Sequence, residues 1–241
     1  MKLKFFLISF ALILILVALY LGATALRDKV NERYHWEEKA LDNFDFSKVL
    51  PAGLNHPLID KKLITIQNKK YLLAGVYGET TKTQSHLYLV GLDFFKRPKV
   101  LSDLDLTEVP DLMPSAPPRL EKLEDLNNDQ EEELVVNLES GGAYIEDYGL
   151  FKIKNNKLSW IELKDKDGKL KPAIFYEGSS VKNAAFWQPL EQNQGLVQFV
   201  GEANEENQWS WKAEAYFWQQ EILNYDPTTS LELSQKGPVS Q

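Results

Sequence analysis

Cysteine is absent from the 241 residues of the chain, and histidine occurs only three times, at the scattered positions 35, 56 and 86. The first absence excludes disulfide bonds, catalytic thiolates and cysteine-ligated zinc. The chain also lacks an excess of basic residues, because its net charge is −8. Binding to nucleic acid needs Lys and Arg on the phosphates, so we expect no nucleic-acid partner.

Catalytic motifs are missing as well. The sequence has no Gly-x-Ser-x-Gly elbow, no His-Glu-x-x-His helix and no phosphate-binding glycine loop. Glu146 and Asp147 are adjacent carboxylates, but neighbouring residues of a strand point to opposite faces and cannot pair as acid and nucleophile. We interpret them as a solvated loop, or as a source of one more oxygen ligand for the acidic stretch described below. We expect the protein not to be an enzyme.

The chain has one long apolar run, from Phe5 to Leu26, and no charged residue interrupts it. At ~1.5 Å per residue a helix of this length spans the ~30 Å hydrocarbon core of a bilayer. Lys2 and Lys4 precede the run, and basic flanks stay on the cytoplasmic side. We therefore predict a single-pass transmembrane helix in residues 1–26, with the C-terminal domain outside the cytoplasm.

A cleaved signal sequence is the alternative for residues 1–26, because Ala23-Thr24-Ala25 has the form of a cleavage site. Cleavage after Ala25 would give a secreted protein. The apolar core of a signal sequence is usually ~7–15 residues long, which is shorter than this run and favours the retained anchor.

The rest of the chain divides by composition. Residues 27–57 are rich in charge and then in Pro and Gly, which predicts a juxtamembrane helix followed by a linker. Residues 58–229 alternate apolar and polar side chains with a period near two, which is typical of β-strands. Residues 230–241 are interpreted as a flexible tail.

An acidic stretch, Asp-Leu-Asn-Asn-Asp-Gln-Glu-Glu-Glu-Leu-Val-Val, runs from position 125 to position 136. Side-chain oxygens recur at Asp125, Asn127, Asp129 and Glu133, and Glu131 can offer its backbone carbonyl. A tight loop with this spacing turns oxygens toward one centre, and Ca²⁺ needs six or more oxygen ligands at short range. We predict a Ca²⁺ loop leading into a strand. The alternative is a polar hairpin loop without a metal.

This stretch resembles the loop of FG-GAP or VCBS-type repeats, which form the blades of integrin-like β-propellers. Their pattern is Asp-x-Asn-x-Asp-Gly-x-x-Asp-Leu-x-Val, and the similarity covers about a dozen residues. The chain departs from the pattern at Gln130, where the family has Gly for a sharp turn, and at Glu133, where it has Asp. The resemblance implies an antiparallel, propeller-like β fold and the Ca²⁺ site.

A weak internal repeat agrees with that fold. Leu72, Leu134 and Leu196 each sit in an apolar segment, at an equal spacing of 62 residues. One strand-like segment precedes each leucine segment and one follows it. A fourth closes the second and third units clearly, and Val100-Leu101 is the candidate for the first, which predicts about three four-stranded blades. Closed propellers usually have ~4–8 blades, so three imply an open or atypical arrangement, a fourth sheet from the linkers, or self-association. The alternative is a coincidence of spacing in a generic β-sandwich.

Four tryptophans, Trp187, Trp209, Trp211 and Trp218, gather in the third repeat. They either fill the core or form a platform that stacks on sugar rings. From these features we expect an all-β, membrane-anchored module for binding or scaffolding at the cell envelope. Its partner is an envelope protein or a glycan that the sequence does not identify. A carbohydrate-binding or glycan-processing domain using these tryptophans is the alternative function.

Overall fold

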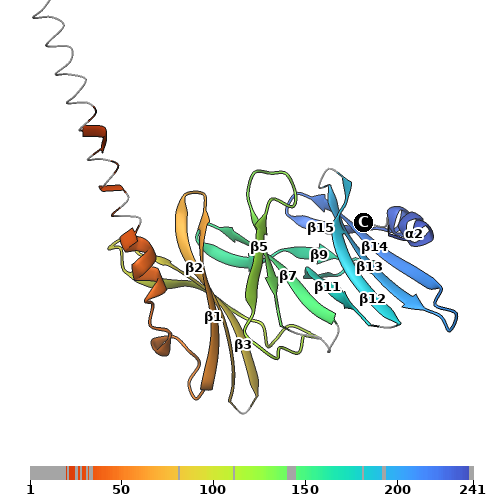
Figure 1. The fold of residues 1–241 in the computed structure, drawn as a ribbon, viewed down its shortest axis with the longest axis horizontal. Helices are drawn as coiled ribbons and strands as arrows, with labels where there is room; N and C mark the ends of the chain where they lie inside the picture. Colours follow the sequence, from red (N-terminus) through yellow and green to blue (C-terminus); the bar gives the residue numbers. More distant parts are fainter. Residues whose placement is uncertain are drawn as a thin grey trace, which may run out of the picture.

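A computed structural model describes residues 20, 22–24, 27, 29, 30, 32, 35–80, 82–110, 112–139, 145–180, 182–191 and 194–238. These residues are mostly antiparallel β-structure in two sheets, neither of them closed (Figure 1). No helix in this part of the chain is both long enough and apolar enough to cross a membrane. The predicted span at 5–26 lies mainly outside the described residues.

The first sheet is a four-stranded antiparallel meander. Its strands are β1 (Asn55–Ile66), β2 (Lys69–Glu79), β3 (Thr83–Leu92) and β4 (Pro98–Asp105). A two-residue turn joins β1 to β2, with φ of +49° at Gln67 and +61° at Asn68. Both central residues of a type I′ turn need positive φ, and such a turn matches the twist of the two strands.

The second sheet has eleven strands in the order β10-β9-β15-β14-β13-β12-β11-β7-β6-β5, with β8 paired to β7 beside this path. Among the described strands, β15 and β9 are the one pair that runs parallel. The strands are β5 (Arg119–Glu124), β6 (Glu133–Asn137), β7 (Ile145–Lys154), β8 (Lys157–Trp160), β9 (Glu162–Lys164), β10 (Leu170–Pro172), β11 (Ile174–Ser179), β12 (Asn183–Pro189), β13 (Gly195–Ala203), β14 (Trp209–Gln219) and β15 (Ile222–Asp226).

Three meanders match the predicted repeat in spacing: β1–β4, β5–β8 and, after β9–β11, β12–β15. Leu72, Leu134 and Leu196 each lie in the second strand of a meander and are at most 1% exposed. The last two meanders are not separate blades, in contrast to the prediction, because β11 pairs with both β7 and β12 and joins them. The first half of β7 extends beyond β8, and β11 satisfies the backbone groups left along that edge.

The two sheets pack through an apolar layer that includes Leu73, Leu89, Leu134 and Phe151. Gly75 allows one close approach at this junction, since a Cβ there would lie 1.7 Å from the carbonyl oxygen of Pro118. The opposite face of the first sheet packs on the N-terminal segment. That segment contains helical residues 35–42 and the 3₁₀ helix η1 (Phe46–Lys48).

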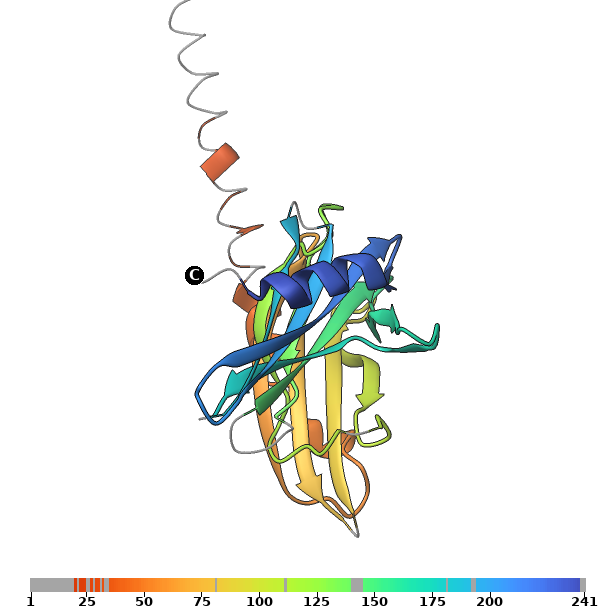
Figure 2. The same cartoon turned by 90° about the vertical axis from the view of Figure 1, so that its right-hand side faces the viewer.

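The prediction of a flexible tail is wrong for residues 230–236, which belong to the helix α2 (Pro227–Lys236). The Asp226 side chain caps this helix, and Figure 2 shows α2 lying across β14. Ser230 and Ser234 accept the backbone N–H groups of Ala215 and Ala213 at 2.8 Å. The helix thereby accepts two backbone N–H groups of β14. The pairing of β14 with β15 ends at Ala215, and Ala213 lies beyond that pairing.

Candidate functional site

The acidic stretch forms the loop between β5 and β6, and its side chains fold back onto its own backbone. The two carboxylate oxygens of Asp125 accept the N–H groups of Asp129 at 3.1 Å and Gln130 at 3.0 Å. Asn127 accepts the N–H of Asp129 at 3.0 Å, and Asp129 accepts that of Glu131 at 2.7 Å. Three oxygen-bearing side chains at alternate positions therefore accept N–H groups of the loop's own backbone.

The backbone of this loop adopts the left-handed conformation twice, at Asn128 with φ of +60° and at Gln130 with φ of +70°. Asn tolerates this conformation, whereas a Gln in it is strained by about 1–2 kcal/mol. Gln130 occupies the position at which the resembled repeats have Gly. The loop therefore makes the turn that the pattern requires despite the side chain at this position.

Glu133 ends the loop at the first residue of β6, and its side chain is only 5% exposed. Its carboxylate accepts the N–H of Leu126 at 2.8 Å. Burial, together with the negative charges of Asp129 and Asp125, raises the pKa of Glu133 to about 7. This carboxylate is thus a buried acid whose charged form is disfavoured unless a positive charge comes close.

Contacts from distant elements hold the loop in place. Gln67, in the β1–β2 turn of the first sheet, donates to the Glu131 carboxylate at 2.9 Å. The indole N–H of Trp218 on β14 donates to the carbonyl of Leu126 at 3.0 Å, and the Leu126 side chain is fully buried. Sequence spacing gives no sign of either contact, because the partners are 64 and 92 residues apart. The loop therefore lies where the two sheets meet.

A small cleft of about 20 Å³ opens beside the loop, which is room for about one water molecule or ion. Lys152 and Lys154 of β7 line it together with Glu221, and both lysines form ion pairs with that carboxylate. Hydrogen bonds from the two lysines lower the pKa of Glu221 to about 2. Both positive charges are thus already compensated by a carboxylate outside the predicted ligand set.

The predicted ligands Asp125, Asn127, Asp129, Glu131 and Glu133 all belong to this one structure, but their carboxylates do not converge. Among the described residues, no group of three or more His, Cys, Asp or Glu side chains is arranged to hold a metal ion. The donor set nevertheless suits Ca²⁺ in kind, because it consists entirely of carboxylate, amide and carbonyl oxygens. A carboxylate oxygen that accepts one N–H group retains further lone pairs for a cation.

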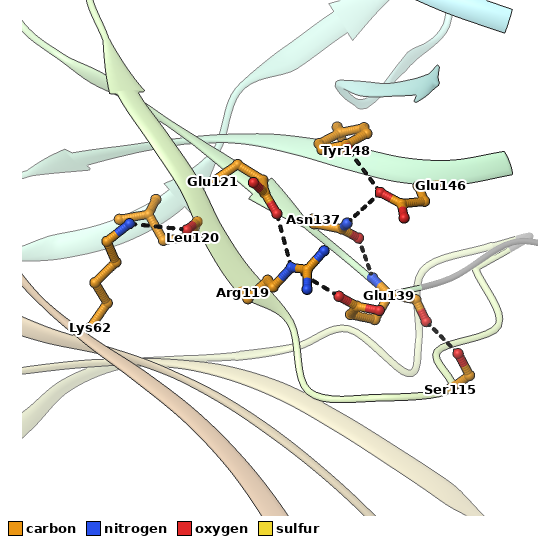
Figure 3. Close-up of polar contacts among 9 residues, drawn as sticks. All are labelled: Lys62, Ser115, Arg119, Leu120, Glu121, Asn137, Glu139, Glu146 and Tyr148. Atoms are coloured by element: carbon orange, nitrogen blue, oxygen red, sulfur yellow. Dashed lines mark hydrogen bonds and ion pairs between the residues drawn. The ribbon is translucent and has the colours of Figure 1, made fainter. Parts of the chain in front are cut away.

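Glu146 lies in a separate polar cluster, shown in Figure 3, and not at this loop. It is part of β7 rather than of a solvated loop, and it accepts hydrogen bonds from Asn137 and Tyr148, each at 2.8 Å. Nearby, the Nε of Arg119 lies 2.9 Å from Glu121 and 3.1 Å from Glu139. The cluster satisfies the fully buried Asn137, and we assign it a structural role.

The four tryptophans of the third meander do not share a face. Trp187 and Trp218 pack against the interior of the second sheet, whereas Trp211 packs against the core beneath α2. Trp209 stacks on Trp211 with ring centroids 5.5 Å apart and is 41% exposed. Core packing accounts for three of these rings, and a sugar-stacking platform gains no support from their placement.

Comparison of the chain with protein-family models, with curated proteins and with solved structures finds no match in any of the three. The resemblance to propeller repeats therefore rests on the residues of the loop.

Proposed function

We propose that this protein is an extracytoplasmic β domain, held at the membrane by residues 5–26, that serves as a binding or scaffolding module of the cell envelope. In this proposal the loop at 125–133 binds Ca²⁺. The basic start and the uncharged run at 5–26 support the anchor. The three meanders are taken as propeller-type units in an open arrangement, because each repeats the same strand order around an equivalent buried leucine.

The loop geometry is the observation on which the Ca²⁺ proposal depends. Alternate side chains point into the loop, and Gln130 adopts the positive φ at which the repeat pattern has Gly. Asp125, Asp129 and Glu133 place three carboxyl groups within nine residues of chain. A divalent cation among them would offset their mutual repulsion and the cost of burying Glu133.

Cation binding at this position would also strengthen the junction between the sheets. Gln67 reaches Glu131 from the first sheet, and Trp218 donates to Leu126 from β14 of the second. Ordering the loop would therefore fix both contacts at once. A junction between the sheets that becomes rigid on Ca²⁺ binding suits a scaffold that works outside the cell, where Ca²⁺ is abundant.

The test compares thermal melting of the full chain in detergent with 2 mM Ca²⁺ and with EDTA. At a Ca²⁺ concentration one hundred times the dissociation constant we expect a gain of ~2.7 kcal/mol, or roughly 5–10 °C in Tm. Asp125→Asn should abolish the gain. The matched control is Asp165→Asn, since Asp165 caps the N–H groups of Asp167 and Lys169 in a similar turn that lies beside lysines.

Equal melting curves in Ca²⁺ and EDTA, for a wild-type protein shown to be folded, would leave only a metal-free polar loop. The anchor is tested separately. Protease added to intact cells should remove the domain, and mass spectrometry should find residues 5–26 in the mature protein. A mature chain that begins at Leu26 would establish the secreted form instead.

A further inference from the structure

The outer edge of the first sheet is an open strand. Among the described strands β1 pairs only with β2, although it is twelve residues long. Three apolar side chains on it are exposed: Leu58 by 55%, Ile59 by 39% and Leu63 by 38%. A long edge strand with exposed apolar residues is a template for pairing with another strand.

The turn at Gln67 and Asn68 determines which backbone groups face outward. A two-residue turn places its closing hydrogen bond between Ile66 and Lys69, which are partners in the register. Hydrogen-bonded pairs alternate along an antiparallel ladder, so the even-numbered residues of β1 bond to β2. The N–H and C=O groups of Ile59, Lys61 and Leu63 therefore point away from the sheet.

The sequence of this edge is complementary to itself. When two copies of β1 run antiparallel about Lys61, Ile59 faces Leu63 of the second copy, and Asp60 faces Lys62. The residues whose backbone N–H and C=O groups point away from the sheet then lie opposite each other. Ile59, Lys61 and Leu63 of the two copies thus form about six hydrogen bonds. The exposed apolar side chains of Ile59 and Leu63 then meet each other, and Asp60 meets the opposite charge of Lys62. Leu58 faces Ile64, which is buried, and Lys61 faces Lys61 of the second copy.

Lysines on an edge strand usually guard against such pairing. Here the ammonium group of Lys61 is already held by Asp42, whose carboxylate lies 3.0 Å away and whose carbonyl also accepts from it. Lys62 donates to the carbonyl of Leu120 at a long 3.4 Å, and its remaining protons are available to Asp60 of a second copy. The like charges at the centre of the pairing are therefore compensated within each chain.

We propose that a second copy of this chain pairs with the β1 edge, so that the two first sheets form one continuous sheet across a two-fold axis at Lys61. The mass of the full chain in detergent, from light scattering or sedimentation, should show a concentration-dependent dimer. Asp60→Lys and Lys62→Asp should each weaken the dimer by roughly tenfold or more, since each makes two like-charge pairs. The double variant should restore it.

The chain has no native cysteine, which permits a direct test of register. Lys61→Cys places two thiols on the axis, at a Cα separation of ~5.5 Å that a disulfide can bridge. Lys99→Cys is the matched control, because Lys99 is an exposed residue of β4 at the other edge of the same sheet. Mild oxidation should cross-link the first variant efficiently and the second only at the rate of random collision.

Equal cross-linking of the two variants, or a wild-type protein that stays monomeric at all concentrations, would overturn the proposal. So would a double charge variant that fails to restore a dimer lost in both single variants. If the edge instead pairs with a strand of a different protein, the isolated chain is monomeric and the second-copy assignment is wrong.

Discussion

Replacement of Glu133 by Gln should make the protein more stable at neutral pH in the absence of Ca²⁺. Glu133 is 5% exposed and its folded-state pKa is about 7, against an ordinary value of 4.5. Its raised pKa means that the folded state binds the proton more tightly than the unfolded state does. The resulting stability is fully present below pH ~4.5 and is lost as the pH rises through ~7.

The separation of the two pKa values corresponds to about 3 kcal/mol of unfolding free energy. Glu133→Gln keeps an oxygen to accept the Leu126 N–H but removes the charge. Urea unfolding in EDTA, followed by tryptophan fluorescence, should show little difference between variant and wild type near pH 4.5. The variant should be more stable by about 3 kcal/mol near pH 8.

Glu132→Gln provides the control, because Glu132 carries the same charge at an exposed position one residue away. The difference in unfolding free energy between Glu132→Gln and wild type should not rise from pH 4.5 to pH 8. Millimolar Ca²⁺ should reduce the pH dependence of the wild type, since a nearby cation favours the ionised carboxylate. A difference between Glu133→Gln and wild type that is the same at pH 4.5 and pH 8 would mean that the buried charge of Glu133 does not destabilise the fold.

Three further substitutions, two of them with a matched control variant, test individual positions. Gln130→Gly should stabilise the fold by about 1 kcal/mol and tighten Ca²⁺ binding, whereas Gln220→Gly, also at a positive φ, should stabilise without affecting Ca²⁺. Ser230→Ala should cost about 1–3 kcal/mol in unfolding free energy, because it leaves the buried N–H of Ala215 without its acceptor. Leu196→Ala should cost about 2–5 kcal/mol, whereas Leu231→Ala, at a 62% exposed site, should change stability by less than about 0.5 kcal/mol.

The strands were predictable because their signal is local. Alternating or continuous apolar runs located the four strands of the second and third meanders, the first three strands of the first meander, and the buried leucines at 72, 134 and 196. Strand β11 was missed because its pairing depends on the unpaired half of β7, which is a property of the assembled sheet. Helix α2 did carry a local signal, since Asp226-Pro227 is a cap followed by Pro in the first turn.

The loop was predictable to the same extent. The spacing of Asp125, Asn127 and Asp129 predicts side chains that turn toward one centre. In the structure they turn back onto N–H groups of the loop, and the carboxylates do not converge. The burial of Glu133 and the contacts from Gln67 and Trp218 were not predictable, because they arise when segments distant in sequence pack together. The same tertiary packing separates the four tryptophans that look like one group in the sequence.

Direct measurement of Ca²⁺ binding to the full chain, by equilibrium dialysis or calorimetry, tests the central claim of a cation site at 125–133. We predict one Ca²⁺ per chain, with a dissociation constant in the micromolar-to-millimolar range of extracellular modules. Binding should be lost in Asp125→Asn and retained in Asp165→Asn. Absence of binding at millimolar Ca²⁺, or equal binding by the two variants, would contradict the account.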